Sequence, residues 1–164
     1  LVDAPAIEVV ARLNATEPRV RLPRKVDFAA RDESNRRLGY AGEQWVIEFE
    51  QQRLTQAGLS ELFQQLDWVS DRLGDGSGYD ILSYDTPISP RYIEVKTTNG
   101  THGSSFIISR NELDFSRETA EAFALYRLFQ FRQAPTLYIL RGDISKKLHL
   151  EPMDYRASFR RFVS

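Results

Sequence analysis

Two neighbouring runs of sequence, YDILSY at residues 79–84 and RYIEVKTT at residues 91–98, decide the fold of this chain. Both runs are rich in β-branched and aromatic residues, and the prolines between them predict two strands joined by a loop. Because side chains alternate along a strand, Glu94 and Lys96 project from one face while their apolar neighbours project from the other. Burial of one face explains the apolar residues, but it does not explain an acid and a lysine on the opposite face.

The expected pairing of these two strands places a second acid beside Glu94. If residues 80–84 pair antiparallel with residues 90–94, Asp80 lies opposite Glu94, with Cβ atoms about 5 Å apart. Two carboxylates at that distance repel each other unless a cation lies between them. Oxygen-rich pairs of this kind suit Mg²⁺ or Mn²⁺, and the backbone carbonyl of Val95 could complete the protein ligands. Lys96 would then lie beside the metal, where a lysine can hold a phosphate oxygen or orient an attacking water.

Outside this hairpin, the periodicity predicts a helix from residue 32 to residue 57, capped by Asp32 or Ser34 and stopped by Gly58. Gly39 and Gly42 weaken this helix locally, which indicates that something packs close against its backbone. The other predicted elements are a helical turn at 59–66, a strand at 68–70, loops at 71–78 and 98–104, a strand at 106–108, a helix at 109–123 whose capping box pairs Ser109 with Glu112, strands at 125–131 and 136–140, and a short helix around 153–159. This order predicts one α/β or α+β domain.

Composition excludes several classes of protein. The 164 residues contain no cysteine, so neither a disulfide framework nor a thiolate zinc site can form. The two histidines, His102 and His149, are too few for a histidine-based zinc site and are interpreted as surface residues. No apolar run approaches the roughly 18 residues that span a bilayer, which predicts a cytoplasmic protein with no membrane partner. The net charge of −1 argues against a globally basic nucleic-acid binder, although binding depends on local charge.

The N-terminal part differs from the rest of the chain. Residues 1–31 are interpreted as an arm or linker, and residues 32–164 as the folded domain. Residues 19–37 hold seven basic and three acidic side chains, which fits either a solvated linker or a contact to phosphates. The chain begins with Leu1 rather than methionine, which suggests a domain of a larger protein.

The residues resemble a known family. Asp80, thirteen intervening residues and then Glu94-Val95-Lys96 are similar to the signature of the PD-(D/E)XK nuclease superfamily, with Tyr79 standing where that signature has proline. More narrowly, the chain resembles the nuclease-like domain at the C-terminus of the NO VEIN protein, relatives of which occur in bacterial restriction and anti-phage proteins. The motifs that carry this resemblance, between about Leu38 and Gly142, are Gly42-Glu43, Trp68-Val69-Ser70, Gly76-Ser77-Gly78-Tyr79-Asp80-Ile81, Ile93-Glu94-Val95-Lys96-Thr97-Thr98 and Ile108-Ser109-Arg110-Asn111-Glu112.

This resemblance implies an α/β fold of the restriction-endonuclease-like type, with a central mixed sheet flanked by helices. It implies Mg²⁺- or Mn²⁺-dependent hydrolysis of phosphodiester bonds, in DNA or alternatively RNA, by an endonuclease domain of a restriction or anti-phage defence protein. By the same resemblance Asp80 and Glu94 are metal ligands, Lys96 is the catalytic lysine and Glu43 is an additional acid near the metal. Fused or cooperating defence or NTPase domains are the expected partners, and a double-strand cut would favour a homodimer.

Three further residues are candidates for contacts to nucleic acid. Arg110 and Asn111 lie where a helix N-terminus favours anions, although helix capping explains them equally well. Thr98 could line the cleft or simply end a strand. Two alternative functions remain open on the sequence: a non-catalytic nucleic-acid-binding or sensing module of a helicase or NTPase protein, and a protein-interaction domain. For Asp80, Glu94 and Lys96 themselves, the alternative is an exposed hairpin face with a surface ion pair.

Overall fold

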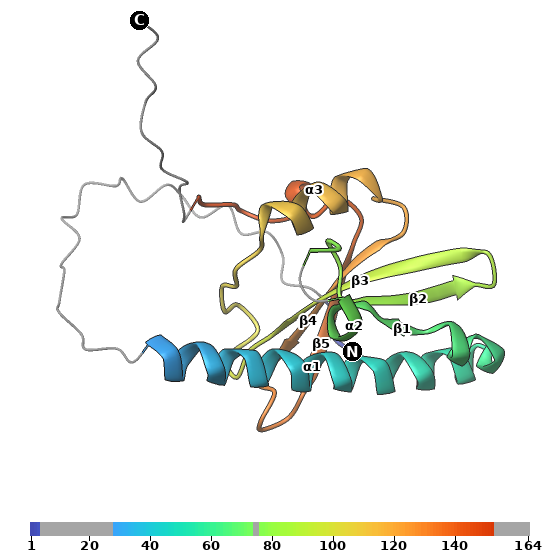
Figure 1. Ribbon diagram of the computed structural model, residues 1–164, viewed down its shortest axis with the longest axis horizontal. Helices are drawn as coiled ribbons and strands as arrows, with labels where there is room; N and C mark the ends of the chain where they lie inside the picture. The colour runs from blue at the N-terminus through green and yellow to red at the C-terminus, as the bar shows by residue number, and fades with distance from the viewer. Residues whose placement is uncertain (4–27, 74–75, 153–164) are drawn as a thin grey trace, which may run out of the picture.

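The computed structural model describes residues 1–3, 28–73 and 76–152. Their elements are, in chain order, α1 (Phe28–Gln56), the 3₁₀ helix η1 (Ser60–Gln65), β1 (Asp67–Trp68), α2 (Val69–Leu73), β2 (Ile81–Thr86), β3 (Ser89–Thr97), α3 (Arg110–Glu118), β4 (Phe123–Phe129), β5 (Thr136–Arg141) and the 3₁₀ helix η2 (Ile144–Lys146). The five strands form one sheet in the order β1-β2-β3-β4-β5 (Figure 1). This is the α/β fold with a flanked mixed sheet that the sequence predicted.

One parallel pairing gives the sheet its mixed character. β3 and β4 run parallel, whereas the other neighbouring strands run antiparallel. A parallel connection needs a crossover, and α3 lies in the chain between β3 and β4. Figure 1 shows α1 along one face of the sheet and α3 across the other. The sheet is therefore the middle of three layers.

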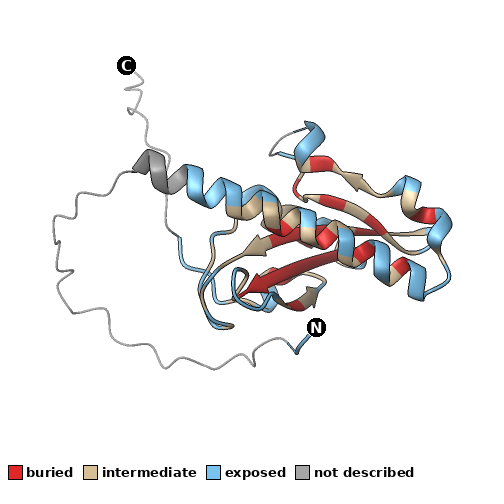
Figure 2. Ribbon diagram, turned by 90° about the horizontal axis from the view of Figure 1, so that it is seen from below, coloured by how far each residue is buried: buried red, intermediate tan, exposed pale blue. Residues whose placement is uncertain are grey.

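Two apolar cores lie on the two faces of the sheet. Ile93 and Val95 of β3 belong to the larger core, together with Val46 of α1. The smaller core forms around Phe123 and Leu125 of β4 and includes side chains of α3. All seven residues of β4 are buried, and Figure 2 shows buried residues on the strands and along one side of α1. β3 therefore faces α1 with its apolar residues and leaves the opposite face for Glu94 and Lys96, as its alternation predicted.

Only one of the two glycines Gly39 and Gly42 in α1 packs closely against another element. A Cβ on Gly42 would lie 1.8 Å from Oγ1 of Thr97, whereas a Cβ on Gly39 would have no atom within 4 Å. The expectation of close packing against the helix backbone is thus confirmed at Gly42 and wrong at Gly39. The Gly42–Thr97 contact fixes the position of α1 along β3, one residue before Glu43.

Several predicted boundaries differ from the structure. α1 begins at Phe28, so Asp32 and Ser34 lie inside the helix and do not cap it, although it ends at Gln56 shortly before Gly58. The strand expected at residues 68–70 ends at Trp68, and α2 occupies the first part of the expected loop. The helix expected to reach residue 123 ends at Glu118, because β4 begins at residue 123.

No strand forms at residues 106–108. Phe106 and Ile108 pack against the smaller core, whereas Ile107 between them is 62% exposed. The apolar run thus covers a core without pairing its backbone in the sheet. Most of the expected N-terminal arm and the helix expected around residues 153–159 lie outside the described residues. No helix in the described part of the chain has the length and apolar composition needed to span a bilayer.

Candidate active site

The register of the β2–β3 hairpin brings the two predicted metal ligands together. Ile81 pairs with Ile93, and Ser83 pairs with Arg91, so the pairing continues toward Asp80 and Glu94 one residue beyond the start of β2. The backbone N–H of Asp80 also donates to the carbonyl of Ile93 over 2.9 Å. The expected register therefore holds, and Asp80 lies at the open end of the hairpin beside Glu94.

The residues that precede Asp80 anchor α3 beside it. Gly78 has φ +85°, and a Cβ at this position would lie 2.7 Å from Phe115 of α3. The ring of Tyr79 stacks on that of Phe115, with centroids 5.1 Å apart, and meets that of Tyr92 edge-on, with centroids 4.9 Å apart. Tyr79 therefore supports the helix that closes the site, which gives the residue at this position of the nuclease-like signature a structural task.

Asp80 is held by the backbone of β3. Its Oδ2 accepts a hydrogen bond of 2.8 Å from the N–H of Val95, while Oδ1 receives no hydrogen bond from the described residues. Burial and then the negative charge of Glu43 raise the pKa of Asp80 to about 7. The carboxyl group therefore exchanges its proton close to neutral pH.

Glu94 and Lys96 form the centre of the site. Glu94 is 2% exposed, and its Oε1 lies 2.7 Å from Nζ of Lys96. Burial and then the charge of Asp80 raise the pKa of Glu94 well above its ordinary value. Burial alone would lower the pKa of Lys96, but Glu94 and Glu112 reverse this and hold the pKa above its ordinary value. Lys96 is therefore a fixed cation and not a general base.

Glu112 is a functional candidate that the sequence explained only as a helix cap. The capping box does form, with the N–H of Glu112 donating to Ser109 Oγ and the N–H of Ser109 donating to Glu112 Oε2. The same Oε2 atom also lies 2.9 Å from Nζ of Lys96. Glu112 thus joins the N-terminus of α3 to the face of β3 that carries Glu94 and Lys96, a contact between residues 16 apart that no local pattern signals.

Glu43 reaches the same cluster from α1. Its Oε2 accepts hydrogen bonds from the indole Nε1 of Trp68, at 2.6 Å, and from the hydroxyl of Ser70. These two donors come from the motif at residues 68–70, which the sequence assigned to a strand without a role in the site. The charge of Glu43 acts on Asp80, so the additional acid lies in the electrostatic environment of the hairpin carboxylates.

A pocket of about 310 Å³ opens over this cluster. Asp80, Glu94 and Glu112 line it together with Asn111, whose Nδ2 donates to the carbonyl of Gly76 over 2.8 Å. Asn111 thus closes one wall of the pocket with the loop before β2. Ser109, and not Asn111, caps α3.

The other two candidates for nucleic-acid contacts lie apart from the pocket lining. The side chain of Arg110 is 93% exposed at the start of α3 and pairs with Asp114 of the next turn over 3.4 Å. Thr98 Oγ1 accepts a hydrogen bond from the N–H of Gly100, which fits the end of a strand and its turn. The structure therefore brings Asn111 into the pocket and leaves Arg110 at the surface beside it.

The carboxylates fit a hard divalent cation in their chemistry. Asp80 and Glu94 offer oxygen donors, and the repulsion between them is a cost that a cation between them would remove. No group of three or more His, Cys, Asp or Glu residues within 1–3, 28–73 and 76–152 is arranged to hold a metal ion. Two carboxylates and water are a ligand set that Mg²⁺ accepts. Val95 contributes its N–H to Asp80, and the proposed role of its carbonyl stays a prediction.

Comparison with known proteins identifies the family of this region. The family model described as "Protein NO VEIN, C-terminal" matches residues 42–140, which is more than half of the chain. The match begins at Gly42, includes all the carboxylates of the site and ends in β5. No curated protein and no solved structure matches the chain.

Proposed function

Since this chain belongs to the NO VEIN C-terminal family, we propose that the pocket over the β2–β3 hairpin is the active site of a metal-dependent endonuclease. The reaction is hydrolysis of phosphodiester bonds in DNA, with Mg²⁺ or Mn²⁺ as cofactor. The observation that carries the proposal is that Asp80 and Glu94 line one pocket while Nζ of Lys96 lies 2.7 Å from Oε1 of Glu94. A surface ion pair would not need a buried glutamate or a second acid beside it.

The charge balance of the pocket supports a cation. Glu94 and Glu112 both pair with the ammonium group of Lys96, and the negative charge of Glu43 acts on Asp80. A DNA phosphate would be repelled by these carboxylates, and a bound divalent cation would reduce that repulsion by offsetting part of the negative charge. Asp80 and Glu94 are the residues that would hold the cation, and Glu43 would support it through its charge.

Each residue of the proposed site then has a defined role. Lys96 stays protonated, so it binds a phosphate oxygen and offsets the negative charge that develops as water attacks. Glu112 and Glu94 hold its ammonium group in place before substrate binds. The divalent cation, when bound, polarises the phosphodiester and makes a nearby water more acidic. No covalent intermediate with the protein is required.

The wider context of the proposal is defence against foreign DNA. The NO VEIN-like motifs resemble those of restriction and anti-phage proteins, so fused or cooperating defence or NTPase domains are the proposed partners. A homodimer would place two active sites on the two strands of a duplex. A restriction-endonuclease-like topology is part of the same proposal.

The test is cleavage of plasmid DNA and of modified phage DNA by this chain with Mg²⁺ or Mn²⁺. We expect cutting that EDTA abolishes and that falls at least 100-fold in Asp80→Asn and in Lys96→Ala. Lys147→Ala, an exposed lysine at the end of η2, is the matched control and should cut like the wild type.

Asp80→Asn is the sharper of the two variants. Lys96→Ala leaves Glu94 and Glu112 without their cation and is expected to destabilise the fold. Asn at position 80 can still accept the hydrogen bond from Val95 while removing a charge that burial disfavours. Undiminished cleavage by Asp80→Asn would overturn the proposed site. Binding of DNA without any metal-dependent cutting would favour the non-catalytic binding module, and no affinity for DNA at any salt concentration would favour a protein-interaction domain.

A further inference from the structure

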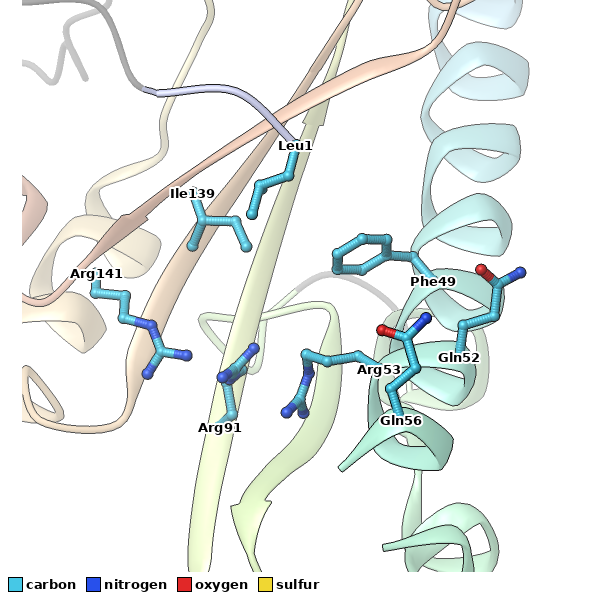
Figure 3. A pocket seen from close by; sticks show the side chains of 8 residues that line it. All are labelled: Leu1, Phe49, Gln52, Arg53, Gln56, Arg91, Ile139 and Arg141. Carbon is cyan, nitrogen blue, oxygen red and sulfur yellow. The ribbon is translucent and has the colours of Figure 1, made fainter. Parts of the chain in front are cut away.

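A second cavity of about 570 Å³ lies on the opposite face of the sheet, between α1 and the strands β3 and β5. Three arginines line it: Arg53 from α1, Arg91 from β3 and Arg141 from β5. Figure 3 shows their side chains side by side across the cavity. No acidic side chain is among the residues that line it in the described structure.

The carboxylates behind these arginines are too few to neutralise them. Glu50 is 0% exposed and accepts hydrogen bonds from Arg53, from the hydroxyl of Ser83 and from the hydroxyl of Tyr126. Asp85 accepts hydrogen bonds from both Arg91 and Arg141. Two carboxylates therefore serve three guanidinium groups, and one positive charge is left over at the cavity.

The donors of the arginines are also incompletely used. Arg91 is 4% exposed, and its Nε atom has no hydrogen-bond partner within the described residues. NH1 of Arg53 donates no hydrogen bond within the described residues, and it lies 3.9 Å from Oδ1 of Asp85, beyond hydrogen-bond distance. The Nε atom of Arg91 is buried, so the free donor on the cavity side is NH1 of Arg53. A terminal guanidinium donor in a cavity with excess positive charge is suited to an oxyanion, phosphate above all.

The remaining lining indicates what carries the phosphate. The cavity is several times larger than a phosphate ion and falls in the size range of small-molecule sites. Phe49 lines it with an aromatic ring that stacks on Trp45, with centroids 5.6 Å apart. Gln52 and Gln56, on consecutive turns of α1, add amide groups at its edge (Figure 3). An aromatic surface and amides beside a cationic end match a nucleobase joined to a phosphate.

We propose that this cavity binds a nucleoside monophosphate, with the phosphate on Arg53, Arg91 and Arg141 and the base toward Phe49, Gln52 and Gln56. The nucleotide is either free or the 5′-phosphorylated end of a nucleic-acid strand, since the two share this chemistry. The site lies on the other face of the sheet from the acidic pocket, so its existence does not rest on the proposed nuclease activity.

The test is isothermal titration calorimetry of the full chain in EDTA. Inorganic phosphate, 2′-deoxyadenosine 5′-monophosphate and 2′-deoxyadenosine are titrated separately. We expect the monophosphate to bind, phosphate to bind more weakly and the nucleoside to bind at least 10-fold more weakly than the monophosphate. Arg141→Gln should weaken monophosphate binding at least 10-fold. Arg117→Gln on α3 is the matched control, because its arginine is 47% exposed where Arg141 is 51% exposed and also pairs with an aspartate.

Three further comparisons identify which residues bind the ligand and which ligand they bind. Gln52→Ala and Gln56→Ala change exposed positions of α1 outside the ion-pair network, and each should weaken the monophosphate severalfold without changing phosphate binding. Asp80→Asn should bind the monophosphate like the wild type even if the nuclease proposal fails. A 5′-phosphorylated oligonucleotide that binds more tightly than the monophosphate would identify a strand end as the source, and weaker binding would identify a free nucleotide. Equal binding by Arg141→Gln and the wild type, or no saturable binding of the monophosphate, would overturn the proposal.

Discussion

At Asp80, burial and the charge of Glu43 favour the protonated carboxyl group in the folded chain. The pKa is about 7 in the folded state, against an ordinary value near 4 in an unfolded chain. Below about pH 4 both states hold the proton, and the carboxyl group costs no stability. Between about pH 4 and pH 7 the folded state holds a proton that the unfolded state has released, so the free energy of unfolding falls as pH rises.

Replacement of Asp80 by asparagine should therefore stabilise the protein. We expect Asp80→Asn to raise the free energy of unfolding by about 2–4 kcal/mol at pH 8 and by much less at pH 4. Urea unfolding of both proteins in EDTA at a series of pH values measures the difference. A gain that does not change with pH would mean that the carboxyl group of Asp80 is not the origin of the effect.

The residues of the two cavities differ in how well their positions could be predicted from the sequence. Asp80 and Glu94 could be placed together because the short connection between two strands leaves few registers. Glu112 could be predicted only as a cap, because its contact to Lys96 depends on how α3 crosses the sheet. The arginine cavity could not be predicted at all, since Arg53, Arg91 and Arg141 come from three elements that are distant in the sequence.

At the scale of elements, α1 is positioned by the contact between Gly42 and Thr97. We expect Gly42→Ala to lower the free energy of unfolding by about 2 kcal/mol or more, because the new methyl group would collide with Thr97 Oγ1. Gly39→Ala is the matched control in the same helix, and it should stabilise the protein by about 1 kcal/mol or less. Thermal and urea unfolding of the two variants and the wild type measure these changes in the free energy of unfolding. Equal effects would show that α1 is not held at this point.

The elements that were misassigned share one physical cause. The run Phe106-Ile107-Ile108 has strand composition, but two of its side chains serve the smaller core and its backbone has no strand partner. Residues 68–70 likewise begin as a strand and continue as α2. A short apolar run in the sequence therefore predicts that its side chains are buried, but it does not predict whether its backbone pairs in a sheet. The long periodic helix α1 and the capping box of α3 were predictable because their signals are local.

For the whole molecule, we expect Mg²⁺ binding at the acidic pocket to raise the free energy of unfolding by an amount that depends on pH. We expect Mg²⁺, held at a fixed concentration of ten times its Kd at pH 8, to add about 1.4 kcal/mol to the free energy of unfolding at that pH. The shift should be larger at pH 8 than at pH 5.5, because protonated Asp80 and Glu94 bind metal poorly. Differential scanning calorimetry with and without EDTA measures this shift. A Tm that rises equally with Mg²⁺ in Asp80→Asn would place the ion elsewhere.

The charge of the whole chain also bears on its substrate. The net charge is −1, so any affinity for DNA must come from local cations such as Lys96 and Arg110. We expect the logarithm of DNA affinity to decline linearly with the logarithm of salt concentration. Binding of a fluorescently labelled duplex to Asp80→Asn, in which we expect cleavage to be lost, measures this dependence. Affinity that does not depend on salt would contradict a contact to phosphates.

Helix α1 carries residues that act at both cavities, and this has a consequence for how relatives of this protein can diverge. Glu43 serves the acidic pocket and Arg53 the arginine cavity, while Gly42 fixes the helix on β3. Each residue inserted or deleted between them would rotate the rest of the helix by about 100° and shift it by about 1.5 Å. Gaps in alignments of relatives should therefore be absent from residues 42–53. They should gather instead at the tip of the β2–β3 hairpin, where Ile88 is 91% exposed.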